Sequence, residues 1–225
     1  CLGSWRVLRK VAGGRVAGGR EVGGLANLLS AHRDLANPAH RAEVAALWGI
    51  PSVPEKPGKT AVEMFQAAAD GEIKALWIAC TNPAQSMPDQ ATVRRALERA
   101  ELVIVQEAFA TTATCAFADL LLPATTWGEK EGTVTNSERR ISRVRAAVPG
   151  AGASRHDWQI VVDVARRIEA LQGRSTTLFP YTTPEAIWNE HRESTRGRDL
   201  DITGMGYAML EAAPQQWPLP EGQSA

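Results

Sequence analysis

The sequence predicts an α/β protein built on a mostly parallel sheet flanked by helices. Three short apolar runs carry this prediction, and helical spacing separates each from the next; the runs are Ile73–Ala79, Leu102–Val105 and Asp119–Leu122. Such alternation favours a parallel sheet. Parallel strands joined by right-handed crossovers all end at the same edge, where the ligands of open sheets bind. We therefore expect a binding site at that edge.

Helical patterns account for most of the remaining chain. Helices are expected at residues 25–35, 39–48, 61–69, 89–100, 111–118, 157–171 and 183–191. Capping patterns support three of them: Asn37 before Pro38, Thr60 with Glu63, and Ser86 with Asp89. The residue order thus predicts strand and helix in alternation through the centre of the chain.

The composition gives no charge bias towards a nucleic acid or a membrane. The 225 residues include 25 Lys plus Arg and 25 Asp plus Glu, and 44% are hydrophobic. No run of eighteen apolar residues predicts a membrane span. The three cysteines Cys1, Cys80 and Cys115 contain no CxxC pair, so this chain alone cannot build a thiolate metal site or an iron–sulfur cluster. Sparse cysteines fit a reducing compartment, and we expect a cytoplasmic protein.

Three regions are expected along the chain. Residues 1–17 have no clear period and are predicted to be a disordered or artefactual end, residues 18–172 form the α/β domain, and residues 173–225 form an irregular extension. The start at Cys1, without an initiator Met, suggests a fragment of a longer protein.

Polar residues follow the predicted strands. Asn82 follows the first run and can form bidentate hydrogen bonds, although it also suits an ordinary turn. Gln106 and Glu107 follow the second run. An acid there accepts hydrogen bonds from ribose hydroxyls in mononucleotide folds, but Glu107 is equally compatible with a solvated loop.

Two charged residues extend this set. Lys130 follows the third run and could place a cation near a phosphate, or could form a surface ion pair that contributes little. Asp157 could accept two N–H bonds from a guanine edge, or could cap the helix that begins there. On converging loops, these side chains together favour a nucleotide-like ligand.

Nucleophilic catalysis has little support. None of the four histidines, His32, His40, His156 and His191, pairs recognisably with a Ser or Cys. Cys80 and Cys115 are most simply inert thiols. Metalloprotease, Walker and EF-hand patterns are missing from the sequence.

Four longer runs resemble a known family. They are GGREVGGL (residues 18–25), WIACTNPAQSMPD (77–89), ADLLLPATTWGEKEGT (118–133) and TNSERR (135–140). They resemble the large catalytic subunit of prokaryotic molybdenum nitrate reductases, most closely the assimilatory type, over about residues 18–218. The LLLP and NSERR patterns recur across the wider molybdopterin oxidoreductase superfamily, whereas CTNPAQS and GREVG narrow the match to nitrate reductase.

The resemblance implies a cofactor and a place for this segment. The family binds two molybdopterin guanine dinucleotides around one molybdenum, with a four-iron cluster nearby whose ligands are not in this chain. Residues 18–172 resemble its third domain, which holds one dinucleotide, and residues 173–225 would lead to a cofactor-closing domain. The implied dinucleotide contacts are Asn82, Gln106, Glu107, Lys130 and Asp157. Arg20 resembles the arginine of the substrate funnel, where a cation suits nitrate.

The resemblance also implies an activity. The full-length enzyme would reduce nitrate to nitrite with electrons from a donor protein or reductase subunit, whereas this segment alone is expected to be inactive. Two alternatives stay open: a formate dehydrogenase-type subunit, and a non-catalytic structural domain of the same fold.

Overall fold

The computed structural model describes residues 27–223, which form two compact units. The parallel-sheet unit consists of Lys59–Glu129 and Val148–Asp157. The antiparallel-sheet unit consists of Lys130–Ala147, Trp158–Ala225 and Cys1–Gly58, in so far as these are described. Arg20 lies outside the described residues. The domain boundaries expected from the sequence stay a prediction.

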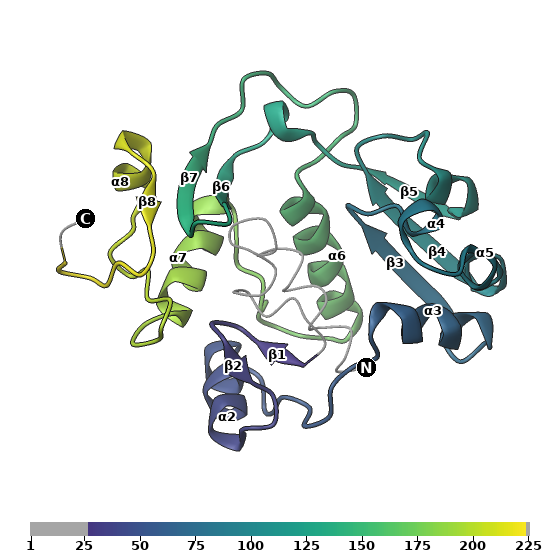
Figure 1. Cartoon of the computed structure of the whole chain (residues 1–225), viewed down its shortest axis with the longest axis horizontal. Helices are drawn as coiled ribbons and strands as arrows, with labels where there is room; N and C mark the ends of the chain where they lie inside the picture. The colour runs from purple at the N-terminus through teal and green to yellow at the C-terminus, as the bar shows by residue number, and fades with distance from the viewer. Residues whose placement is uncertain (1–26, 224–225) are drawn as a thin grey trace. The chain divides into compact units, whose positions relative to one another are not determined.

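The parallel-sheet unit contains the three strands that the apolar runs predict. They are β3 (Ala75–Ala79), β4 (Leu102–Glu107) and β5 (Leu120–Pro123). They lie in the order β3-β4-β5, and both neighbouring pairs are parallel (Figure 1). The fold class expected from the sequence, α/β with a parallel sheet flanked by helices, is confirmed.

Helices cover one face of this sheet. They are α3 (Ala61–Ala69), α4 (Pro83–Ser86), α5 (Gln90–Arg99) and the 3₁₀ helix η1 (Ala113–Phe117), and a second 3₁₀ helix, η2 (Trp127–Glu129), follows β5. Val103 and Val105 alternate along β4 and share a buried cluster with Phe65 of α3 and Leu97 of α5. The alternation explains why these strand residues face the helices, since successive side chains point to opposite faces of a sheet.

The predicted caps of this unit are confirmed at α3 and corrected at α5. At α3, Thr60 Oγ1 accepts from the Glu63 N–H and Glu63 Oε2 accepts from the Thr60 N–H, which is a complete capping box. At α5 the cap is Asp89 itself, whose carboxylate accepts from the Thr92 N–H at 3.2 Å. The Ser86–Asp89 pattern was therefore the wrong box, because Ser86 ends α4 and the chain turns at Asp89 with φ +49°.

The antiparallel-sheet unit is organised around β6 (Gly132–Thr135), β7 (Arg140–Val144) and β8 (Gln215–Gln216), in the order β6-β7-β8. Its helices are α2 (Pro38–Leu47), α7 (Pro184–Ser194), α8 (Tyr207–Ala212) and α6 (Asp157–Leu171), whose first residue belongs to the parallel-sheet unit. Ile141 of β7 and Trp188 of α7 share a buried cluster with Leu210 of α8. Asn37 caps α2, as expected, and Thr183 caps α7.

The helix expected at residues 25–35 is wrong within the described part of that segment. The structure has two short antiparallel strands there, β1 (Leu28–Leu29) and β2 (Arg33–Asp34). Ala31 and His32 join them with φ values of +55° and +56°, a conformation incompatible with a right-handed helix. Arg33 is buried and donates to Glu43 Oε2 at 2.7 Å and to the Ser194 carbonyl at 2.7 Å, and these contacts stabilise the turn.

In the described residues no helix combines the length and apolarity of a membrane span.

Candidate functional site

The carboxyl ends of the parallel strands bring together four of the residues predicted from the sequence. Asn82 follows β3, while Gln106 and Glu107 are the last residues of β4. Asp157 arrives from further along the chain. The bridge between Ala124 and Arg155, with the Thr125 N–H donating to the Arg155 carbonyl at 3.0 Å, runs the segment before Asp157 alongside the end of β5.

Asn82 is held by its own neighbours. Its Oδ1 accepts from the Thr114 N–H at 3.1 Å and from Thr114 Oγ1 at 2.6 Å. Its Nδ2 donates to Oε1 of the exposed Gln85 at 3.0 Å. Of the polar atoms of the Asn82 side chain, Nδ2 is therefore the one suited to ligand binding, because a ligand could replace the exposed Gln85 as its acceptor.

Gln106 and Asp157 contact each other directly. Gln106 Nε2 donates to Asp157 Oδ1 at 2.9 Å, and Cys80 Sγ donates to the same oxygen at 3.3 Å. Gln106 is completely buried, whereas Asp157 keeps 7% of its surface exposed. Gln106 therefore has no surface to offer a ligand here, although Asp157 has a little.

Glu107, which follows Gln106 in the chain, is half-buried. Its Oε1 accepts from the Ala108 N–H at 2.7 Å. No described residue donates to its Oε2. One carboxylate oxygen is therefore fixed in place while the other is left to accept from a hydroxyl group.

Lys130 belongs to the antiparallel-sheet unit, where it precedes β6. It is 7% exposed and does interact with other groups. Because Lys130 is buried, a weak ion pair on the surface does not describe it. A buried ammonium group needs a close partner. Its proximity to the other four residues stays a prediction.

The sequence reasoning missed three residues of this edge. Thr114 supports Asn82, Cys80 supports Asp157, and His156 Nδ1 lies 3.0 Å from Thr125 Oγ1. Cys80 was interpreted as inert, although its place directly after a strand was the signal. Thr114 and His156 carried no signal, since each contacts a residue about thirty positions away.

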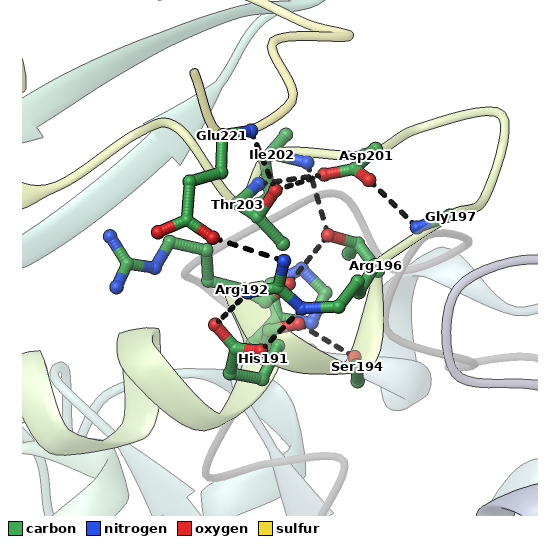
Figure 2. A network of polar contacts seen from close by, with 11 residues as sticks. His191, Arg192, Ser194, Arg196, Gly197, Asp201, Ile202, Thr203 and Glu221 are labelled. Atoms are coloured by element: carbon green, nitrogen blue, oxygen red, sulfur yellow. Dashed lines mark hydrogen bonds and ion pairs between the residues drawn. The ribbon is translucent and has the colours of Figure 1, made fainter.

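A second polar network lies in the antiparallel-sheet unit (Figure 2). The Asp201 carboxylate accepts from the Gly197 N–H at 2.7 Å and from the N–H and hydroxyl of Thr203 at 2.9 and 2.6 Å. Burial raises the pKa of Asp201, but these hydrogen bonds outweigh it and hold the pKa below its usual value. Thr203 Oγ1 accepts in turn from the Glu221 N–H at 2.9 Å. The Asp201 carboxylate and the Thr203 hydroxyl thus bind each other and backbone N–H groups, so they fix the loop that follows α7.

Metal ligation has no obvious place in the part of the chain that the structure describes. No group of three or more His, Cys, Asp or Glu side chains there is arranged to hold a metal ion. The edge at Asn82, Glu107 and Asp157 instead offers amide and carboxylate groups, which suit an organic ligand with N–H and O–H donors.

Comparison with known proteins identifies the family. A family model described as molybdopterin oxidoreductase matches residues 7–167. The chain belongs to the molybdopterin oxidoreductase family. This confirms the resemblance drawn from the sequence motifs, and a domain of this family implies a molybdenum–pterin cofactor.

Relatives of this molybdopterin oxidoreductase chain include named nitrate reductases. A nitrate reductase of Klebsiella oxytoca is 44% identical over 214 residues, covering 91% of this chain and 24% of the relative. The assimilatory nitrate reductase catalytic subunit of Bacillus subtilis is 39% identical over 204 residues, covering 89% and 28%. Formate dehydrogenase H of Escherichia coli is 33% identical over 201 residues, covering 88% and 26%. The chain thus spans about a quarter of the length of these relatives.

A solved structure shares the fold. Acetylene hydratase from Pelobacter acetylenicus superposes with a TM-score of 0.56 at 21% identity, covering 71% of this chain and 21% of the other. At this identity the likeness concerns the fold alone.

Proposed function

We propose that this chain is the dinucleotide-binding α/β segment of a molybdenum nitrate reductase of the assimilatory type. The observation that carries the proposal is the meeting of Gln106 and Asp157 at the carboxyl edge of a parallel sheet. Nitrate reductases among the relatives, at 39% and 44% identity, support the choice of substrate.

The residues of this edge fit a guanine nucleotide. Asp157 is an acceptor-only side chain, and guanine presents two neighbouring N–H donors. The buried Gln106 donates to that carboxylate from the protein side, so the ligand meets a carboxylate that is already oriented. Glu107 Oε2 would accept from a ribose hydroxyl and Asn82 Nδ2 would donate to the ligand, while Lys130 would balance a phosphate charge.

In the complete enzyme, the cofactor would be molybdenum bis(molybdopterin guanine dinucleotide), together with a four-iron cluster bound outside this chain. The chemistry that this cofactor supplies is two-electron transfer to nitrate, which with two protons gives nitrite and water. Arg20 would attract the nitrate anion. An electron donor protein would complete the cycle, and the site of action would be the cytoplasm.

The second candidate function is that of a formate dehydrogenase-type subunit, favoured by the 33% identity to formate dehydrogenase H. It shares the dinucleotide site and differs in substrate. The polypeptide encoded by the whole gene decides between them: nitrite formation from nitrate with reduced methyl viologen supports the proposal, and formate oxidation supports the alternative.

The nucleotide site is tested on the 225-residue chain by calorimetric titration with GMP and with AMP. We expect GMP to bind more tightly, because adenine lacks the paired donors that a carboxylate accepts. Asp157→Asn should lower the GMP-to-AMP affinity ratio by about tenfold, as expected for a bidentate contact. Asp70→Asn, at an exposed carboxylate of the same unit, is the matched control and should not change the ratio. Equal binding of GMP and AMP by the wild type would favour the non-catalytic structural domain.

A further inference from the structure

Gln106 is an unusual residue to find completely buried at the end of a strand. Its side chain has no exposed surface. Its Nε2 makes its hydrogen bonds to Asp157, at 2.9 Å to Oδ1 and 3.5 Å to the backbone carbonyl. Its Oε1 has no hydrogen-bond partner among residues 27–223. A buried carbonyl without a donor is destabilising, and a methionine or leucine would fill similar volume without that penalty.

The orientation of the amide is fixed by chemistry. Turning it over would place Oε1 against Asp157 Oδ1, and two acceptors in contact repel each other. The glutamine therefore presents its NH₂ group to Asp157, and its own oxygen meets no donor within the described part of the chain. Cys80 adds a weaker donor at 3.3 Å to the same oxygen.

We infer that Gln106 is a positioning residue that selects guanine through Asp157 without touching the nucleotide. Its N–H bond stops rotation of the carboxylate and aims it at the two donors of the guanine edge. This inference rests on the proposed function, and it replaces the direct contact that the family resemblance implied for Gln106.

The test compares GMP with IMP, whose base lacks only the 2-amino donor of guanine. The 225-residue chain is titrated with each nucleotide as wild type, Gln106→Met and Asp157→Asn. Gln106→Met keeps the buried volume and removes the donor, so it should lower the GMP-to-IMP affinity ratio by about tenfold, within the range of one bidentate contact. If Gln106 had a merely structural role, its substitution would weaken the binding of GMP and of IMP equally and leave the affinity ratio unchanged.

The matched control is Gln66→Met. Gln66 also donates to a carboxylate, that of Asp70 at 2.9 and 3.0 Å, but on the exposed surface of α3. This variant should keep the wild-type ratio. Thermal unfolding is followed for all variants, with Gln106→Leu as a second apolar replacement.

The outcomes separate the two claims. Loss of the ratio in Asp157→Asn but not in a folded Gln106→Met overturns the positioning role and leaves the proposed function intact. A wild type that does not distinguish GMP from IMP overturns both. Unfolding of both Gln106→Met and Gln106→Leu assigns the glutamine to the core alone and also overturns the positioning role.

Discussion

His191 shows how strongly burial acts on a single residue. It lies on α7 with 8% of its surface exposed, and its Nε2 has no hydrogen-bond partner among the described residues. Desolvation lowers the pKa of His191 to about 4, from an ordinary value of 6.5. In the folded protein the ring therefore stays neutral at pH values where the unfolded chain takes up a proton.

We predict that this histidine makes the folded state sensitive to acid. Between pH 6.5 and about 4 the unfolded state binds more protons than the folded state, so the free energy of unfolding falls as the pH falls. The loss amounts to about 3 kcal/mol once the pH is below both values. Urea unfolding at a series of pH values should show that His191→Leu lacks this part of the decline.

Described carboxylates of the same unit, among them Glu193 and Asp201, also respond to acid, which makes a comparison with the wild type necessary. A hydrogen bond from Arg196 lowers the pKa of Glu193, and the pKa of Asp201 is lowered as well. The stability that each carboxylate gives to the folded protein is therefore also lost as the pH falls. The informative quantity is the difference between variant and wild type. A difference between His191→Leu and wild type that is independent of pH would contradict the prediction.

Residue by residue, the sequence indicates which side chains reach the sheet edge but not what each one does there. Gln106 and Asp157 are 51 positions apart, and nothing in the local pattern says that one is buried to hold the other. Asn82 was expected to be a ligand contact or a turn residue, and its hydrogen bonds show that it also anchors Thr114. Such roles depend on long-range packing, which periodicity does not encode.

Among the elements, β3 and η1 are joined through one side chain. Asn82 accepts two hydrogen bonds from the completely buried Thr114, at the start of η1. These bonds tie the end of a strand to the first turn of a short 3₁₀ helix. The connection belongs to the geometry of the candidate site, since Asn82 is one of its residues.

We predict that Asn82→Ala destabilises the protein by about 1–3 kcal/mol, because it leaves the buried Thr114 donors without an acceptor. Asn82→Asp keeps an oxygen in the same place and should stay closer to the wild type. Both free energies of unfolding come from urea titration. Both variants lose the Nδ2 donor, so weaker GMP binding in both, with destabilisation only in Asn82→Ala, would separate the two roles. Equal destabilisation by the two substitutions would count against the anchoring role.

The elements themselves were predictable where the signal was local and long enough. The three parallel strands and α6 follow directly from apolar runs and helical spacing. The antiparallel sheet was not expected, because β8 joins β7 from a distant and polar part of the chain. The segment at residues 25–35 misled for a different reason: its leucines have helical spacing, while the turn depends on the contacts of Arg33.

For the whole molecule, the sheet order leaves β5 at an edge. Among residues 27–223, the segment that accompanies it lies at its carboxyl end, at the bridge from Ala124 to Arg155. Leu120 and Leu121 of this strand are 47% and 44% exposed, and Phe109 and Leu102 of the same unit are exposed as well. An apolar edge strand is prone to pair with other chains. We therefore expect the 225 residues by themselves to bind hydrophobic dyes and to self-associate.

The prediction is tested by replacing one leucine of that edge and one elsewhere. Leu120→Lys places a charge on the edge strand, and should reduce both dye fluorescence and the sedimentation-detected oligomer, because charged side chains oppose edge-to-edge pairing. Leu171→Lys makes the same change at a leucine that is 89% exposed at the end of α6, where it stands apart from a sheet edge. That variant should behave like the wild type, since singly exposed apolar residues are ordinary. A wild-type chain that is monomeric and binds no dye would show that the edge strand β5 is protected. Equal effects of the two substitutions would show that the added charge, and not its place on the sheet edge, controls association.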